Sequence, residues 1–169
     1  MSMFKYSVNT NGLERKYSIS EIVDMCVTLN LDGIEWGLPS LDKAKNDVKE
    51  MASQTVDAGL EVVGYINGGK LWKEDELKQW ADVVHSVSGK SLRVAHPWVA
   101  YNYDEALHQE KSFTEIFNMT RDAMPFIEKL SEESGVRFLV ETHGGALVAS
   151  PLAAIRLFAG VSSNHVGII

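Results

Sequence analysis

The chain has 169 residues, of which 45% are hydrophobic and 23% are charged, as in a globular protein with one core. The net charge of −7, with no cluster of Lys and Arg, argues against a nucleic-acid surface, and no apolar run could cross a membrane. A disulfide scaffold is excluded because Cys26 is the only cysteine, and MSMFKYSVNT is too polar for a signal peptide. We expect a cytoplasmic protein that binds neither membrane nor nucleic acid.

Short β-branched stretches alternate with longer amphipathic stretches along the chain. Strands are predicted over residues 4–8, 33–36, 61–66, 92–96, 136–141 and 165–169. Helices are predicted between them, over residues 18–29, 41–58, 73–86, 112–134 and 150–158. This order indicates a parallel α/β sheet. We see no linker or change of composition, so residues 1–169 are predicted to form a single domain.

Residues with known capping preferences support the ends of several predicted helices. Ser18 is followed three residues later by Glu21, the spacing of a capping box, and Ser150-Pro151 fits an N-cap followed by the first helical position. Gly59 and Gly135 follow helical patterns directly, which is typical of helix C-termini. The helix boundaries therefore rest on local chemistry as well as on periodicity.

Two parallel architectures fit this pattern. A doubly wound sheet would be complete with six strands, whereas an eightfold (β/α) TIM barrel needs about 250 residues. The chain ends at NHVGII, inside a predicted buried strand, which would be an odd terminus for either fold. We therefore expect a piece of something longer: an incomplete barrel of about six strands and five helices.

Polar side chains follow most of the predicted strands, at the edge where parallel α/β proteins place their functional groups. They are Glu35, Asn67, His96, Glu141 and His143. Four of the five can bind a metal or move a proton. Their convergence on one edge predicts a functional site there.

Glu141 and His143 are two residues apart, so on an extended strand they would point to the same side. A carboxylate and an imidazole so placed can both reach a divalent cation at about 2.0–2.2 Å. The alternative is structural: Glu141 caps a helix or pairs with an arginine. Gly144-Gly145 would permit a tight turn directly after them.

The other candidates also carry two interpretations each. His96 precedes Pro97 and is either a metal or proton ligand or a histidine satisfied under a loop. Glu35 could bind substrate hydroxyls beside Trp36 as an aromatic wall, or it could form an ion pair at the rim of the sheet.

Motifs at these positions resemble one known group in their order and spacing. They are DGIEWG, GLEVVGY, LRVAHPW, VRFLVETHGG and NHVGII, which resemble the xylose isomerase-like TIM-barrel superfamily over the whole chain. That superfamily includes sugar phosphate isomerases/epimerases and, more distantly, AP endonucleases.

The resemblance implies that Glu141 is a divalent-metal ligand that also acts as, or lies beside, the proton-transferring base. The metal would be Mn, Mg, Zn or Co, and the remaining ligands are expected beyond Ile169. Some members place substrate- or metal-binding histidines where His143 and His96 stand. Glu35, Trp36, Asn67 and His96 are expected to bind the substrate.

For the intact protein we expect a metal-dependent isomerase or epimerase of a sugar or sugar phosphate, which removes a proton next to a carbonyl. One alternative is a metal-dependent phosphodiesterase resembling AP endonucleases. Another is an inactive fragment or interaction module, in which an unpaired sixth strand would favour a homo-oligomer.

Overall fold

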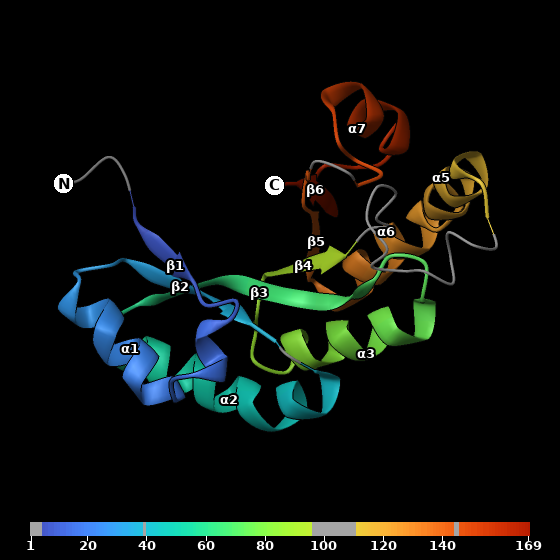
Figure 1. Ribbon diagram of the computed structural model, residues 1–169. Coiled ribbons are helices and arrows are strands. Elements are labelled where there is room, and N and C mark those ends of the chain that lie inside the picture. The colour runs from blue at the N-terminus through green and yellow to red at the C-terminus, as the bar shows by residue number, and fades with distance from the viewer. Residues whose placement is uncertain (1–4, 39, 96–110, 144–145) are drawn as a thin grey trace.

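The computed structural model describes residues 5–38, 40–95, 111–143 and 146–169, with only the backbone described at residues 67–69 and 95. Six strands form a single sheet: β1 (Ser7–Asn9), β2 (Gly33–Gly37), β3 (Glu61–Lys70), β4 (Ser91–Ala95), β5 (Arg137–Val140) and β6 (Val166–Ile168). Every neighbouring pair is parallel, and the strands follow one another in sequence order from β1 to β6 (Figure 1). The predicted parallel sheet of six strands is confirmed.

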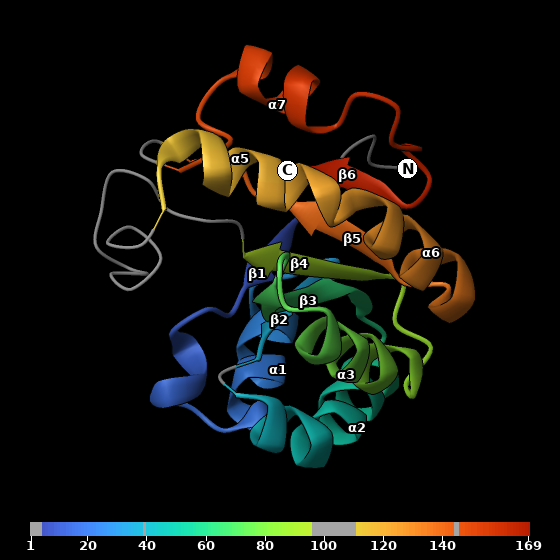
Figure 2. The same ribbon diagram turned by 90° about the vertical axis from the view of Figure 1, so that its right-hand side faces the viewer.

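The connections between strands are helical. They contain the 3-10 helix η1 (Leu13–Arg15) and the helices α1 (Ile19–Thr28), α2 (Leu41–Asp57), α3 (Glu74–His85), α5 (Phe113–Asp122), α6 (Met124–Ser134) and α7 (Pro151–Leu157). Figure 2 shows α1, α2 and α3 together on one side of the sheet, with α6 beside β5. A parallel sheet in sequence order with helical crossovers is the arrangement of a (β/α) barrel wall.

The predicted helix caps are present. The Ser18 hydroxyl accepts a hydrogen bond from the Glu21 N–H, and the Glu21 carboxylate accepts one from the Ser18 N–H, which completes a capping box. Ser150 caps α7 by accepting from the Ala153 N–H. Gly135 follows α6 with a φ of 69°, a left-handed conformation that suits glycine.

The structure corrects one predicted helix. Residues 112–134 form two helices, α5 and α6, which meet at Ala123. Pro125, the second residue of α6, has no N–H to donate, and its ring clashes with the carbonyl four residues earlier in a continuous helix. The 3.6-residue periodicity persists through the break, which is why the pattern predicted a single helix.

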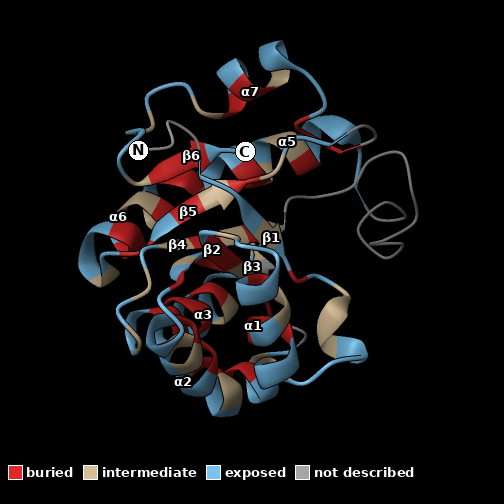
Figure 3. Ribbon diagram, turned by 90° about the vertical axis from the view of Figure 1, so that its left-hand side faces the viewer, coloured by how far each residue is buried: buried red, intermediate tan, exposed pale blue. Residues whose placement is uncertain are grey.

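The two faces of the sheet differ in character. Large apolar side chains on alternate strand positions face the helices and are fully buried there; they include Ile34, Trp36, Leu92, Phe138 and Val140. The intervening positions face the other side of the sheet, as the two-residue period of a strand requires. Figure 3 shows buried residues gathered between the sheet and the helices.

Within the described part of the chain, β1 and β6 are the edge strands, each paired on one side only. No helix among the described residues is long and apolar enough to cross a membrane.

Candidate functional site

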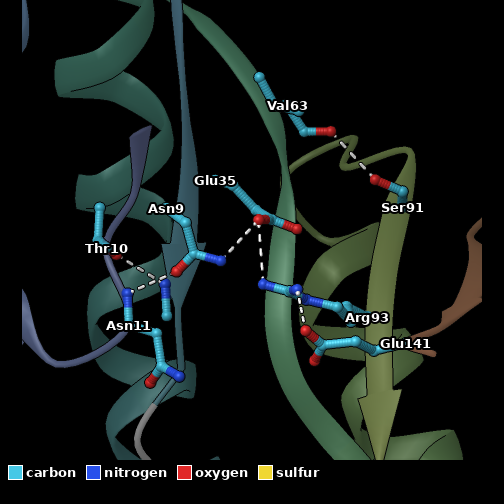
Figure 4. A network of polar contacts seen from close by, with 9 residues as sticks. Asn9, Thr10, Asn11, Glu35, Val63, Ser91, Arg93 and Glu141 are labelled. Carbon is cyan, nitrogen blue, oxygen red and sulfur yellow. Dashed lines mark hydrogen bonds and ion pairs between the residues drawn. The ribbon is translucent and has the colours of Figure 1, made fainter. Parts of the chain in front are cut away.

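Arg93 joins two carboxylates on the face of the sheet opposite the helices. Its Nη2 lies 3.2 Å from Glu35 Oε2, and its Nη1 lies 3.2 Å from Glu141 Oε1 (Figure 4). The side chains of Arg93 and Glu35 are only 11% and 13% exposed, whereas that of Glu141 is 47% exposed. The three residues come from β4, from β2 and from the position just after β5, so the site spans the middle of the sheet.

Asn9 extends this network to the first strand. Its Nδ2 donates to Glu35 Oε2 at 2.9 Å, and its Oδ1 accepts from the Asn11 N–H at 2.9 Å. Glu35 is therefore held from two sides, by an amide and by a guanidinium. Next to it, the Thr10 hydroxyl accepts from the Gly37 N–H at 2.8 Å, which ties the end of β1 to the end of β2.

Alternation along each strand places these groups together. Glu35 stands between two residues buried against the helices, Ile34 and Trp36, and Arg93 stands likewise between Leu92 and Val94. The polar residue is the one that the pleat turns away from the helices. A charged residue flanked by buried apolar neighbours thus lies on the inner face of the curved sheet.

A glycine in β3, Gly64, packs closely against Ser91 of β4. Gly64 pairs with Glu35 in the register of β2 and β3, so the two residues face the same side. A Cβ atom on Gly64 would lie 2.4 Å from Ser91 Oγ, which itself donates to the Val63 carbonyl at 3.0 Å (Figure 4). Gly64 therefore allows β3 and β4 to approach closely beside Ser91, whereas Arg93 itself stands in register with Ile66 of β3.

The chemistry of the network follows from its charges. Two carboxylates and one guanidinium leave a net charge of −1, and among these three charged groups Glu141 is the most exposed. The Arg93 Nε atom is buried without a hydrogen-bond partner in the described structure. A buried N–H without an acceptor is uncommon in folded proteins.

The described residues do not form a metal site by themselves. No group of three or more His, Cys, Asp or Glu side chains lies close enough together to hold an ion in the ranges that the structure describes. Glu141 contacts the Arg93 guanidinium with Oε1, so its nearest described counter-charge belongs to the protein. This is the arginine pairing that the sequence left open as the structural interpretation of Glu141, and the ion pair of Glu35 is likewise one of the two interpretations left open for that residue.

Trp36 is a correction to the expected substrate pocket. Its side chain is 0% exposed, and its Nε1 donates to Thr55 Oγ1 of α2 at 3.0 Å. It follows Glu35 directly, so the strand turns it to the opposite face, toward the helices. An aromatic wall beside Glu35 cannot come from the adjacent residue of the same strand.

The remaining predicted residues are placed differently from the expectation or lie outside the description. Strand β5 ends at Val140, and His143 is an exposed residue three positions further on. Asn67 lies inside β3, not at its exit, and its side chain is not described. His96 lies outside the described residues.

Two members of the network were missed from the sequence. Arg93 lies in the motif LRVAHPW, and Asn9 directly follows the first predicted strand, residues 4–8. The available signal was an arginine inside an otherwise apolar strand, because a buried charge requires a partner. The spacing of residues along the sequence does not show which carboxylate pairs with Arg93.

An apolar hollow of about 740 Å³ lies beside the network, between α7 and β6. Its lining includes Thr142, Pro151, Ile155, Phe158 and Ile168, and it contains none of the charged residues of the network. Apolar walls do not match the hydroxyl groups of a sugar, so we do not assign the hollow to the site.

Comparison with solved structures identifies the architecture. D-psicose 3-epimerase, in a structure determined in the presence of D-fructose, superposes with a TM-score of 0.75 at 12% sequence identity, over 98% of this chain and 62% of that chain. The IOLI protein with a bound zinc atom gives 0.74 at 16% identity, over 98% and 62%. A xylose isomerase-like TIM barrel protein from Mycobacterium smegmatis in complex with magnesium gives 0.70 at 10% identity, over 98% and 64%.

The chain has the xylose isomerase-like barrel fold, represented by six strands. It spans less than two thirds of the length of these three neighbours. No protein-family model and no curated protein matches the sequence. The likeness concerns the xylose isomerase-like barrel as a fold.

Proposed function

We propose that this chain belongs to an enzyme that isomerises or epimerises a sugar or sugar phosphate by removing a proton next to a carbonyl. The observation that carries the proposal is the Glu141 carboxylate. It follows the carboxyl end of β5, is half exposed, and is oriented by Arg93 on the inner face of a xylose isomerase-like barrel. The active sites of such barrels lie at this end of the strands.

Glu141 is the proposed base. A carboxylate within hydrogen-bond reach of a carbon-bound proton next to a carbonyl can remove it and return it to the same or a neighbouring carbon. His143, two residues further on, is proposed to bind a substrate hydroxyl or to stabilise the enediolate. Glu35, Asn67 and His96 are proposed to bind substrate hydroxyls, whereas Trp36 is left out because it is fully buried on the other face.

A divalent cation, Mn, Mg, Zn or Co, is part of the proposal. The zinc and the magnesium in two neighbouring structures support it. Glu141 would be one ligand, and the other ligands would lie outside the residues described here. When bound, such a cation supplies Lewis-acid polarisation of the substrate carbonyl.

The proposed ligand is a small carbohydrate, and D-fructose in the D-psicose 3-epimerase structure supports this class. A cytoplasmic location is proposed from the sequence alone. No observation favours the phosphodiesterase alternative. The arginine of the described inner face is already neutralised by two carboxylates, and a DNA phosphate would find no free cation in this network.

Deuterium exchange tests the proposal. The protein is incubated in D₂O with Mn²⁺ and a panel of ketohexoses and their phosphates, and proton NMR follows the signal of the carbon next to the carbonyl. We expect at least one sugar to lose this signal with the native chain and to keep it with Glu141→Gln. Equal exchange by both proteins, or no exchange with any sugar, would contradict the activity for this chain.

A further inference from the structure

The partners of Arg93 are not held equally. Glu35 is nearly buried and is also fixed by Asn9, so the Arg93–Glu35 pair has contacts on three strands. Glu141 is nearly half exposed and stands after the end of its strand. The contact between Arg93 and Glu141 is therefore the one that can open while the rest of the network stays in place.

We propose that Arg93 is a positioning residue that controls how readily the Glu141 carboxylate accepts a divalent cation. This role rests on the proposed metal role of Glu141, because the Arg93 guanidinium and the cation would compete for the same carboxylate. The guanidinium orients the carboxylate toward the inner face. It also occupies, with its own positive charge, one of the directions from which a cation would bind.

Electrostatics gives the expected size of the competition. A cation on Glu141 would lie a few ångströms from the Arg93 guanidinium, because Nη1 is 3.2 Å from Oε1. Either the ion pair opens or two cations share one carboxylate. The loss of an ion pair with one half-exposed partner and a screened repulsion at this distance together weaken cation binding by about three- to tenfold.

The nearly buried Glu35 determines which variant of Arg93 is suitable for the test. Replacing Arg93 alone leaves Glu35 as a nearly buried, unpaired charge, and the variant could fail to fold. Glu35→Gln/Arg93→Gln removes the buried pair as a unit and keeps the net charge of the chain. Glu141 is then released from the guanidinium without an orphaned charge next to it.

Paramagnetic broadening by Mn²⁺ measures weak binding at one residue. Mn²⁺ is titrated into the ¹⁵N-labelled native chain and each variant, and the amide signal of Thr142, next to Glu141, is followed. We expect half-maximal broadening in Glu35→Gln/Arg93→Gln at a Mn²⁺ concentration about three- to tenfold lower than in the native chain. Thermal unfolding of each variant checks that it is folded.

Two further variants separate the possible outcomes. Arg137→Gln removes an arginine from β5 that lies two residue pairs nearer the amino end of the sheet than Arg93, in register with Ser91, and should leave the titration unchanged. If Glu141→Gln broadens like the native chain, the metal role of Glu141 is wrong and the inference falls with it. If Glu141→Gln weakens binding but the double variant matches the native chain, only the role of Arg93 is wrong. Absence of broadening at Thr142 in every protein would overturn both.

Discussion

The indole Nε1 of Trp36 donates a hydrogen bond to Thr55 Oγ1 at 3.0 Å and thereby joins β2 to α2 inside the core. The Thr55 hydroxyl in turn donates to the Met51 carbonyl at 2.6 Å. Trp36 and Thr55 are both fully buried. A hydrogen bond as well as packing therefore holds Trp36 on the helix-covered face of the sheet, opposite to the face on which its neighbour Glu35 lies.

Thr55→Val is predicted to destabilise the protein by about 1–3 kcal/mol, because it leaves the Trp36 N–H buried without an acceptor. Chemical denaturation measures the change in the free energy of unfolding. Thr55→Ser keeps the acceptor and serves as the control, with a smaller loss from the missing methyl group. A loss as large in Thr55→Ser as in Thr55→Val would show that packing, not the hydrogen bond, matters here.

Arg93→Gln is predicted to cost about 3 kcal/mol of folding free energy, because it leaves Glu35 nearly buried and unpaired. Glu35→Gln/Arg93→Gln should cost clearly less than Arg93→Gln, since both charges are removed together. Urea unfolding of the native chain, both single variants and the double variant gives the coupling energy. Additive effects of the two single changes would contradict the ion pair.

Gly64→Ala is predicted to destabilise the sheet by about 1–3 kcal/mol, because the new methyl group would lie 2.4 Å from Ser91 Oγ. Ser91→Ala removes that oxygen, and the remaining neighbours of the methyl group lie at 3.5 and 3.7 Å, which are ordinary contacts. Gly64→Ala/Ser91→Ala should therefore be more stable than Gly64→Ala alone. Thermal unfolding of the three variants tests this. A double variant no more stable than Gly64→Ala would show that the methyl group clashes with the backbone and not with the Ser91 hydroxyl.

Ser112 and Glu115 form a second capping box, at the start of α5, and the two boxes predict a pH dependence of stability. Hydrogen bonds from Ser18 and Ser112 lower the pKa of Glu21 and Glu115, respectively, below the usual value of 4.5. A carboxyl with a lowered folded-state pKa stabilises the fold above its unfolded pKa, and this contribution is lost as the pH falls through the folded-state pKa.

Stability should therefore decrease as the pH is lowered from about 5 through the titration range of these carboxyls. Glu21→Gln/Glu115→Gln keeps an acceptor at each capping position and removes the titration. Its melting temperature should depend less on pH over that interval than that of the native chain. Identical pH profiles would rule out a contribution from the capping boxes.

The sequence contained most of the fold because the relevant signals are local. Strand and helix order follow from periodicity, and Ser18 and Gly135 mark helix ends through contacts within a few residues. The break at Ala123 was missed because one proline does not interrupt the apolar pattern around it. The end of β3 was placed too early because pairing with β4 extends the strand through Asn67 to Lys70.

The sequence by itself determined that Glu35 and Glu141 stand near the carboxyl ends of parallel strands, since a strand and its exit are readable from neighbouring residues. Only the tertiary structure decided that both carboxylates meet Arg93, and that Trp36 turns away from them to Thr55. The partner of a charged side chain depends on the register of strands distant in sequence and on the curvature of the sheet. Neither is encoded in the residues adjacent to the charge.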